Sequence, residues 1–189
     1  MADRPRRCWH NDVMADTAFA DGLETDRLIL RRRREDEAAL YRLLRTERDP
    51  RVPSHRRIDA AGRPTEDDIA AGIRAEAAEP GPGILGVHRK DTGHVIGYCG
   101  LVAHGNGTVD EPELVYELLR AAHGHGYATE AAGAVVDWAA RSGYRRLWAG
   151  VRDWNVASRR VLAKLGFRET DQVRLDATYG DNLLTVWER

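Results

Sequence analysis

Apolar side chains recur along the chain with two different spacings, which alternate from one segment to the next. Intervals of three and four residues are typical of a helix with one buried face, whereas short apolar or alternating runs between turn residues predict strands. The predicted helices span residues 35–49, 65–79, 127–142 and 155–167. The predicted strands span residues 27–33, 84–90, 94–104, 113–119, 146–151, 168–176 and 182–188.

Turn and capping residues mark the ends of several of these elements. The segment 91–93 separates two strands as the turn of a hairpin, and Thr65 with Asp68 resembles a helix capping box. The resulting order, β-α-α-β-β-β-α-β-α-β-β, predicts a single α/β domain with a mixed central β-sheet flanked by helices. We place this domain at residues 23–189 and interpret residues 1–22 as a poorly ordered leader.

Composition narrows the class of protein. The chain has 189 residues, of which 42% are hydrophobic and 31% charged, and this is sufficient for one domain with its own core. A formal net charge of −1 argues against a main role in coating nucleic acid or an anionic membrane. No apolar stretch approaches the roughly 18 residues of a membrane span. The basic run Arg31–Arg34 is therefore interpreted as the solvated end of a strand, and we expect no nucleic-acid or membrane partner.

The two cysteines exclude some chemistry. Neither Cys8 nor Cys99 belongs to a C-x-x-C pair, so the chain has no zinc-ribbon or redox motif. Cys99 lies in an apolar run, where a buried reduced thiol is expected. This cysteine usage favours a cytoplasmic protein, and both a monomer and a homodimer are compatible with the sequence.

The segment HGHGYATEAAG, residues 123–133, places two glycines directly before a predicted helix. One interpretation is an ordinary strand-to-helix turn. The other is a cradle for phosphate oxygens, because N–H groups converge at a helix N-terminus and the helix dipole adds about half a positive charge. Gly124 and Gly126 would supply positive φ angles and close approach for a bulky anion. Thr129 replaces the third glycine of a dinucleotide fingerprint, and no Walker A motif occurs.

Other side chains near this turn have simpler explanations. His104, His123 and His125 lack a carboxylate or cysteine at a ligand spacing, and a turn of N–H groups favours an anion, so no metal site is expected. Glu130 lies in the first turn of the predicted helix, where the helix dipole alone favours an acidic residue.

Two motifs at a fixed distance resemble the GNAT superfamily of acetyl-CoA-dependent N-acetyltransferases. They are GHGYATEA and DWNVASRRVLAKLGF, and the sequence is most similar to the RimJ/RimL-like branch, which acetylates the N-terminal amines of ribosomal proteins. The resemblance covers about residues 23–188. The matching positions are Glu113, Tyr116, Gly124, Gly126, Ala128, Thr129, Glu130, Ala131, Asn155, Ser158, Leu162, Lys164, Gly166 and Phe167. Ala121 and His123 depart from the pattern of the family.

The resemblance implies transfer of an acetyl group from acetyl-CoA to a primary amine by direct attack in a ternary complex. The implied acceptor is the α-amine of a protein N-terminus. Two alternatives stay open: acetylation of a small amine or an aminoglycoside-type antibiotic, and a non-catalytic CoA-binding regulatory domain.

The resemblance also implies roles for individual residues. Glu113 is the first candidate for the base that deprotonates the amine, although a solvated strand-end acid is the alternative. Glu117 would lie on the same side of the strand. Ser158 or Tyr116 would protonate the departing thiolate. The residues expected to contact acetyl-CoA are Leu118, Leu119, His123, Gly124, His125, Gly126, Tyr127, Ala128, Thr129, Asn155 and Ser158. Among these, the amides of Leu118 and Leu119 would form the oxyanion site.

Overall fold

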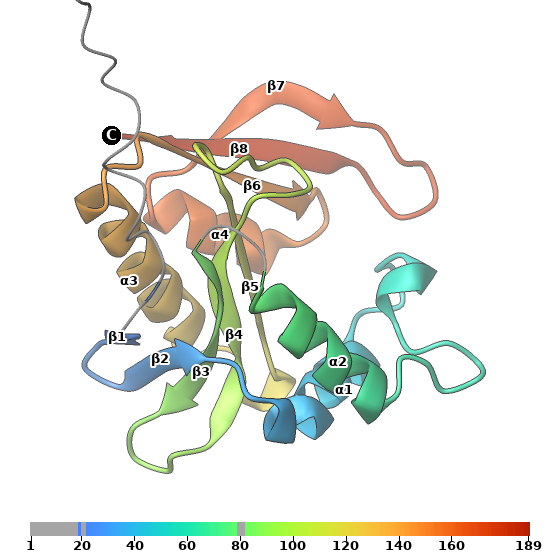
Figure 1. The fold of residues 1–189 in the computed structure, drawn as a ribbon. Coiled ribbons are helices and arrows are strands. Elements are labelled where there is room, and N and C mark those ends of the chain that lie inside the picture. Colours follow the sequence, from blue (N-terminus) through green and yellow to red (C-terminus); the bar gives the residue numbers. More distant parts are fainter. Residues whose placement is uncertain (1–18, 20–21, 79–81) are drawn as a thin grey trace, which may run out of the picture.

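The computed structural model describes residues 19, 22–78 and 82–189 (Figure 1). In this part of the chain eight strands form one sheet in the order β1-β2-β3-β4-β5-β6-β8-β7. The strands are β1 (Leu23–Glu24), β2 (Leu28–Arg32), β3 (Gly83–Arg89), β4 (Val95–Val102), β5 (Glu113–Leu118), β6 (Arg146–Arg152), β7 (Arg168–Arg174) and β8 (Asn182–Glu188). The α-helices are α1 (Ala38–Glu47), α2 (Glu66–Glu76), α3 (Tyr127–Arg141) and α4 (Val156–Lys164). Short 3₁₀ helices are η1 (Glu35–Glu37), η2 (Ser54–Arg56) and η3 (Arg120–Ala122).

These elements confirm the predicted α/β domain with a mixed sheet. Every predicted helix and strand is present, and Thr65 caps α2 with the predicted reciprocal bonds to Asp68. The sequence pattern did not predict β1 or the 3₁₀ helices, which are too short to show a period. No helix in the described part of the chain combines the length and the hydropathy needed to cross a membrane.

The helices cover the sheet on both faces, with α3 and α4 on one side and α1 and α2 on the other (Figure 1). The larger core lies under α3, whose buried side chains recur at helical spacing and pack on the inner strands. Each fully buried leucine or valine of this core contributes about 1.5–3 kcal/mol. A second cluster joins α1 to α2 and reaches the sheet through Val95 and Tyr98 of β4.

The predicted leader contributes to the larger core. Of residues 1–22, the structure describes only Phe19 and Gly22, and the remainder lies outside the described residues. Phe19 is buried, and its ring centroid lies 4.2 Å from that of Trp138 on α3. The packed domain therefore includes at least one residue before Leu23.

The basic run at the end of β2 is tied to its surroundings by ion pairs. Arg31 bonds Glu37 at 3.1 Å, Arg34 pairs with Asp36 at 2.6 Å, and Arg33 pairs with Glu76. The Arg33 guanidinium also lies over two tyrosine rings of the second cluster. These contacts give three of the four arginines a role in joining β2 to η1 and α2.

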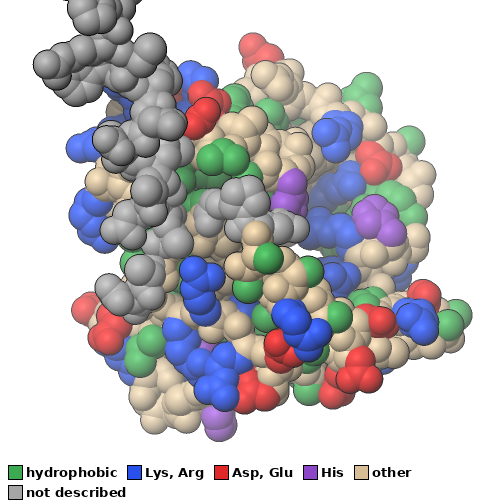
Figure 2. Space-filling model, in the orientation of Figure 1, with side chains coloured by type: hydrophobic (Ala, Val, Ile, Leu, Met, Phe, Trp, Pro, Cys, Tyr) green, Lys and Arg blue, Asp and Glu red, His purple; other side chains and the backbone are tan. Residues whose placement is uncertain are grey.

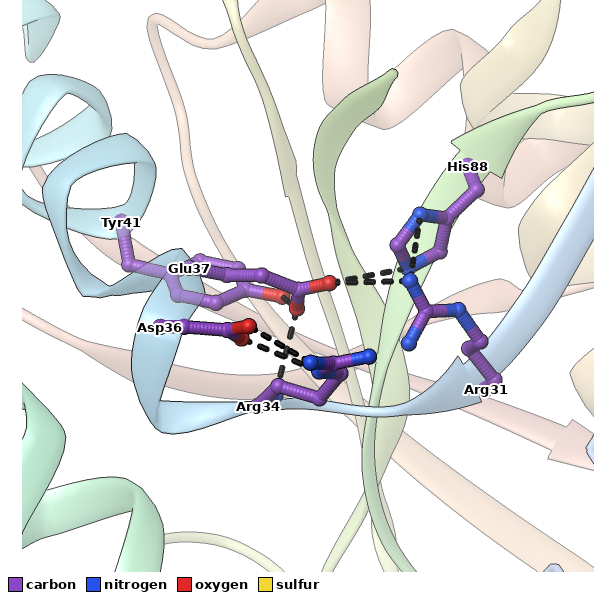
Figure 3. Close-up of polar contacts among 6 residues, drawn as sticks. All are labelled: Arg31, Arg34, Asp36, Glu37, Tyr41 and His88. Carbon is purple, nitrogen blue, oxygen red and sulfur yellow. Dashed lines mark hydrogen bonds and ion pairs between the residues drawn. The ribbon is translucent and has the colours of Figure 1, made fainter. Parts of the chain in front are cut away.

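His88 of β3 is buried beside this region and faces charged groups from two elements (Figure 3). Its Nε2 atom lies 3.6 Å from Glu37 Oε1 and has no hydrogen-bond partner among the described residues. Its Nδ1 atom lies 3.4 Å from Arg31 Nη2. Tyr41 and the backbone N–H of Arg34 donate to the other oxygen of Glu37. Burial lowers the pKa of His88, the Arg31 charge lowers it further, and Glu37 opposes both.

This lowered pKa predicts a loss of stability in mild acid. The unfolded chain takes up a proton near pH 6.5, whereas the folded chain resists protonation at His88. The free energy of unfolding should therefore fall as the pH drops from 7.5 to 5.5. Urea unfolding of His88→Gln should show a smaller fall over the same range. Equal falls in the two proteins would contradict this account of His88.

Candidate active site

The strands β5 and β6 are parallel neighbours that separate after one paired position. They pair in register only at Glu113 and Trp148, near the start of each strand, and the other strand pairs of the sheet are antiparallel. Beyond this pair the ladder stops, although both strands continue. Strand alternation directs the N–H groups of Tyr116 and Leu118 toward β6, where no ladder partner meets them. A split lined by unpaired backbone groups therefore opens toward the C-terminal ends of the two strands.

Glu113 lies at the closed end of this split and bridges its two sides. Its Oε1 atom accepts from the N–H of Gly150 on β6 at 3.0 Å and from Asn106 Nδ2 at 3.0 Å. Its Oε2 atom accepts from the Asn106 N–H at 2.9 Å. A Cβ on Gly107 would lie 2.4 Å from the Glu113 nitrogen, so this loop must be glycine-rich to wrap the carboxylate. The predicted base is thus engaged in three hydrogen bonds that join β5, β6 and the loop before β5.

The two predicted proton donors lie together on the α4 side of the split. Tyr116 Oη is 2.7 Å from Ser158 Oγ and 3.2 Å from the Ser158 carbonyl oxygen, and either hydroxyl can donate in the shorter contact. Asn155 caps α4 by accepting from the Ser158 N–H at 3.1 Å, which fixes the first turn of the helix. Two of the positions that match the family, Tyr116 on β5 and Ser158 on α4, are 42 residues apart and meet in one hydroxyl pair.

Burial keeps this hydroxyl pair protonated. Burial raises the pKa of Tyr116 to about 12, and the hydrogen bond with Ser158 only partly opposes the rise. The phenol therefore holds its proton at neutral pH. Cys99, on the neighbouring strand β4, is fully buried, and burial raises the pKa of its thiol. Cys99 is consequently a core residue and not a nucleophile, as expected from the sequence.

The glycine turn between η3 and α3 has the geometry of an anion cradle. Gly124 and Gly126 have φ angles of 79° and 81°, which confirms the predicted need for glycine. None of the backbone N–H groups of residues 124–129 donates to a described residue, whereas the next one, of Glu130, donates to the Gly126 carbonyl. A Cβ on Gly124 would meet no atom within 4 Å, so this side of the turn is open. Converging free N–H groups at the start of a 15-residue helix suit a diphosphate.

Thr25 and Arg27, which lie between β1 and β2, hold this turn through hydrogen bonds to Glu130 and His125. Glu130 accepts from the Arg27 N–H at 2.9 Å, from Arg27 Nε at 2.7 Å and from the Thr25 hydroxyl at 2.5 Å. Arg27 also donates to the His125 carbonyl at 3.0 Å and covers the Tyr127 ring. Sequence analysis missed Arg27 and Thr25, since a partner about 100 residues away leaves no local signal.

The histidines of the turn serve its shape. His123 Nε2 lies 2.9 Å from the carbonyl oxygen of Leu118, and His125 Nδ1 lies 2.8 Å from the His123 carbonyl oxygen. The His125 ring stacks on Tyr127. In the described ranges no group of three or more His, Cys, Asp or Glu side chains could hold a metal ion.

Of the two predicted oxyanion amides, only one faces the split. The Leu119 N–H donates to the Ile96 carbonyl oxygen on the β4 side at 2.9 Å. The Leu118 N–H points the other way, into the split. The structure therefore leaves Leu118 as the available donor of this pair.

The face of β5 opposite to Tyr116 carries a second polar group, which is centred on Glu117. The sequence did not predict the partners of this carboxylate. Glu117 lies on the same face as Glu113, as expected from strand alternation. Arg48, just after α1, forms a bidentate pair with Glu117, and Tyr98 donates to the same carboxylate at 2.9 Å. The side chain of Arg48 is only 8% exposed. This carboxylate is therefore neutralised by a buried guanidinium.

Comparison with known proteins identifies the fold and the family. The model of the Acetyltransferase (GNAT) domain matches residues 27–168, which is most of the chain. None of the curated proteins matches the chain.

Solved structures give a consistent result. RimJ of Mycobacterium smegmatis, in complex with CoA-disulfide, is 25% identical, with 85% of this chain and 81% of that chain covered and a TM-score of 0.65. The yncA protein of Salmonella typhimurium, solved with its cofactor acetyl-CoA, is 20% identical, with 85% and 93% covered and a TM-score of 0.66. A mutant of the spermidine N-acetyltransferase SpeG of Vibrio cholerae is 13% identical, with 87% and 95% covered and a TM-score of 0.69.

The split strands, the anion cradle and the family match agree with one another. The chain belongs to the GNAT acetyltransferase family and is an acetyl-CoA-dependent N-acetyltransferase.

Proposed function

We propose that this protein acetylates the α-amine of a protein N-terminus, as a member of the RimJ/RimL-like branch. The observation that carries the proposal is that two carboxylates, on the face of β5 turned away from α3 and α4, are both engaged by hydrogen-bond donors. Glu113 is held by three N–H donors, and Glu117 is held by Arg48 and Tyr98. Because both carboxylates are occupied by donors, neither is free to take a proton from the amine. The enzyme therefore suits an amine that is partly neutral without the help of a base.

The amine chemistry follows from ordinary pKa values. An α-amine has a pKa of about 7.7–8.0, so a substantial fraction is neutral near pH 7.5. The amines of lysine and related alkyl amines have a pKa of about 10.4 and need a base to lose the proton. An acceptor of the first kind requires from the enzyme mainly orientation and a neutral path for the released proton.

The donor is proposed to bind on the α3–α4 side of the sheet. The free N–H groups of residues 124–129 would hold the diphosphate of acetyl-CoA, and its thioester supplies the acetyl group. The Leu118 N–H, which faces the split, would stabilise negative charge on the carbonyl oxygen during attack. The acceptor then has the opposite face, between β5 and the segment from α1 to α2.

Tyr116 and Ser158 are proposed to return a proton to the leaving thiolate. If Tyr116 donates to Ser158 Oγ, the Ser158 hydroxyl proton is free to point into the split. Ser158 then gives its proton to the sulfur and recovers one from Tyr116, and solvent takes up the proton released by the amine and returns one to Tyr116. This chain needs a tyrosine that is neutral at the working pH, as burial ensures here.

Glu113 is proposed to act by position. Its three hydrogen bonds set where β5 and β6 separate, and the distance between the two sides of the split follows from that point. The base expected at this residue from the resemblance stays a competing hypothesis, which a substitution can test.

Release of free thiol from acetyl-CoA tests the proposed function directly. Short peptides with free N-termini should be acetylated, and the same peptides with blocked N-termini but a free lysine should not. Spermidine and an aminoglycoside provide the small-amine comparison. Preferred turnover of either one would contradict a protein N-terminus as the acceptor, and calorimetric binding of acetyl-CoA without turnover of any amine would indicate a non-catalytic domain.

The cradle predicts different results for two glycines with similar backbones. Gly124 and Gly143 both have positive φ, at 79° and 92°, and a Cβ on either meets no atom within 4 Å. Substitution by valine should destabilise each protein by at least about 1–2 kcal/mol through backbone strain. Only Gly124→Val should also weaken acetyl-CoA binding, by tenfold or more in calorimetry. Equal affinities in the two variants would refute the cradle.

The hydroxyl pair predicts non-additive kinetics. Tyr116→Phe and Ser158→Ala should each lower kcat by on the order of 10²-fold with little change in acetyl-CoA affinity, and the double variant should lose little more. Because the pKa of Tyr116 is about 12, wild-type kcat should not fall between pH 7 and 10 through loss of its proton. Multiplicative losses in the double variant would show that the two hydroxyls act independently.

Glu113→Gln distinguishes a positioning residue from a base. Whichever way the new amide is turned, at least one of the three N–H donors faces an NH₂ group, which should destabilise the protein by about 1–3 kcal/mol. Asp110→Asn, an exposed change in the same loop, is the matched control and should leave the melting temperature unchanged. Lost turnover with unchanged stability in Glu113→Gln would restore the base hypothesis.

A further inference from the structure

The acceptor face beside β5 carries more arginine than carboxylate. Arg45 and Arg48 lie close to Glu117, and Arg56 lies close to Arg45 and to Tyr98, which bonds the same carboxylate. The carbonyl of Arg56 accepts a hydrogen bond from each of the other two arginines. Arg48 neutralises Glu117. Arg45 and Arg56 therefore add two positive charges here, and neither forms a salt bridge with a described residue.

Of these two arginines, Arg45 is the more buried, since Arg56 is exposed. It projects from α1 and is partly buried, and it forms no salt bridge with a described residue. Its one hydrogen bond, to the Arg56 carbonyl oxygen, is long at 3.4 Å. Burial lowers the pKa of Arg45 and the neighbouring Arg48 charge lowers it further, whereas Tyr98 and Glu117 oppose the shift. Glu117 is already paired with Arg48, and a partly buried cation that forms no salt bridge of its own among the described residues can accept an anion.

The cluster lies at the mouth of the split. On one side Arg48 is fixed to Glu117, the residue before Leu118, whose N–H faces the split. On the other side the guanidinium of Arg51 lies 4.2 Å from the ring centroid of Trp154, which follows β6. The segment between α1 and α2 therefore touches both arms of the split. Lys and Arg side chains gather around a hollow near this segment, at the right of Figure 2.

We propose that the acceptor carries a carboxylate next to its amine, and that Arg45 and Arg56 bind this carboxylate at the mouth of the split. The inference rests on the proposed function and adds the charge of the substrate. A cationic acceptor such as a polyamine would meet like charge here, whereas an acidic group would find two unpaired guanidinium groups. The carboxylate is that of an acidic second residue in a protein N-terminus or the α-carboxylate of a free amino acid.

The test compares peptides that differ in one residue. Three peptides begin with serine and share a tail, and their second residue is aspartate, asparagine or lysine. Wild-type enzyme should show kcat/KM for the aspartate peptide at least about tenfold above that for the lysine peptide, with asparagine between them. Because the contact is electrostatic and partly exposed, this preference should shrink as salt is raised from about 0.05 to 0.5 M. Free serine is included as a fourth substrate, and its turnover shows whether an α-carboxylate can take the place of the aspartate side chain.

Variants locate the preference. Arg45→Gln should reduce the ratio between the aspartate and asparagine peptides to near one, and Arg45→Lys should retain part of it. Arg141→Gln, an exposed change at the far end of α3, alters the net charge equally and should keep the wild-type ratio. Calorimetry with acetyl-CoA and a thermal melt show whether each variant is folded with its donor site intact.

The outcomes separate the inference from the function on which it rests. Equal turnover of the three peptides, or an unchanged ratio in Arg45→Gln, would overturn the carboxylate site while leaving N-terminal acetylation in place. Faster turnover of free serine than of every peptide would keep the carboxylate site and reject the protein N-terminus. If acetyl-CoA binds and no α-amine is acetylated, both proposals fail.

Discussion

The active site depends on one incomplete pairing in an otherwise continuous sheet. The strands β5 and β6 are held together by one parallel bridge and by the carboxylate of Glu113, which takes the Gly150 N–H as its donor. A longer ladder would close the sheet and consume the backbone groups of Tyr116 and Leu118. Without any bridge, the position of β5 relative to β6 would not be fixed. The bridge and the Glu113 carboxylate together hold the strands at one end, so the unpaired N–H groups beyond them stay beside the hydroxyl pair.

The two faces of β5 carry different groups. Even-numbered residues of β5 face α3 and α4, where Tyr116 meets Ser158 and the cradle begins the long helix. Odd-numbered residues face the segment after α1, where Glu117 meets Arg48. The α3–α4 face is therefore suited to acetyl-CoA, and the opposite face carries the charge that would select an acceptor. Substitutions on that face can change selectivity with little effect on the cradle.

Local patterns allowed much of this structure to be predicted, and distance in sequence limited the rest. Helical spacing predicted α3, and the glycine pair predicted the positive φ angles at Gly124 and Gly126, because both depend on neighbouring residues. The family resemblance assigned Tyr116 and Ser158 to one site. The engagement of Glu113 was not visible, because it depends on how residues 105–107 fold around the carboxylate. Arg48 pairs with a residue 69 positions away, and no periodic pattern encodes such a contact.

One small contact links the two ends of the proposed donor site. The ring of His123, inside the cradle, is bonded to the carbonyl oxygen of Leu118, and the N–H of the same residue faces the split. A diphosphate held by the turn would therefore also restrain the strand end that faces the reacting carbonyl. A shortened acetyl thioester without its nucleotide half would lose this restraint. Such a donor should then react more slowly even at saturation, because energy from remote contacts is being used to order the reacting centre.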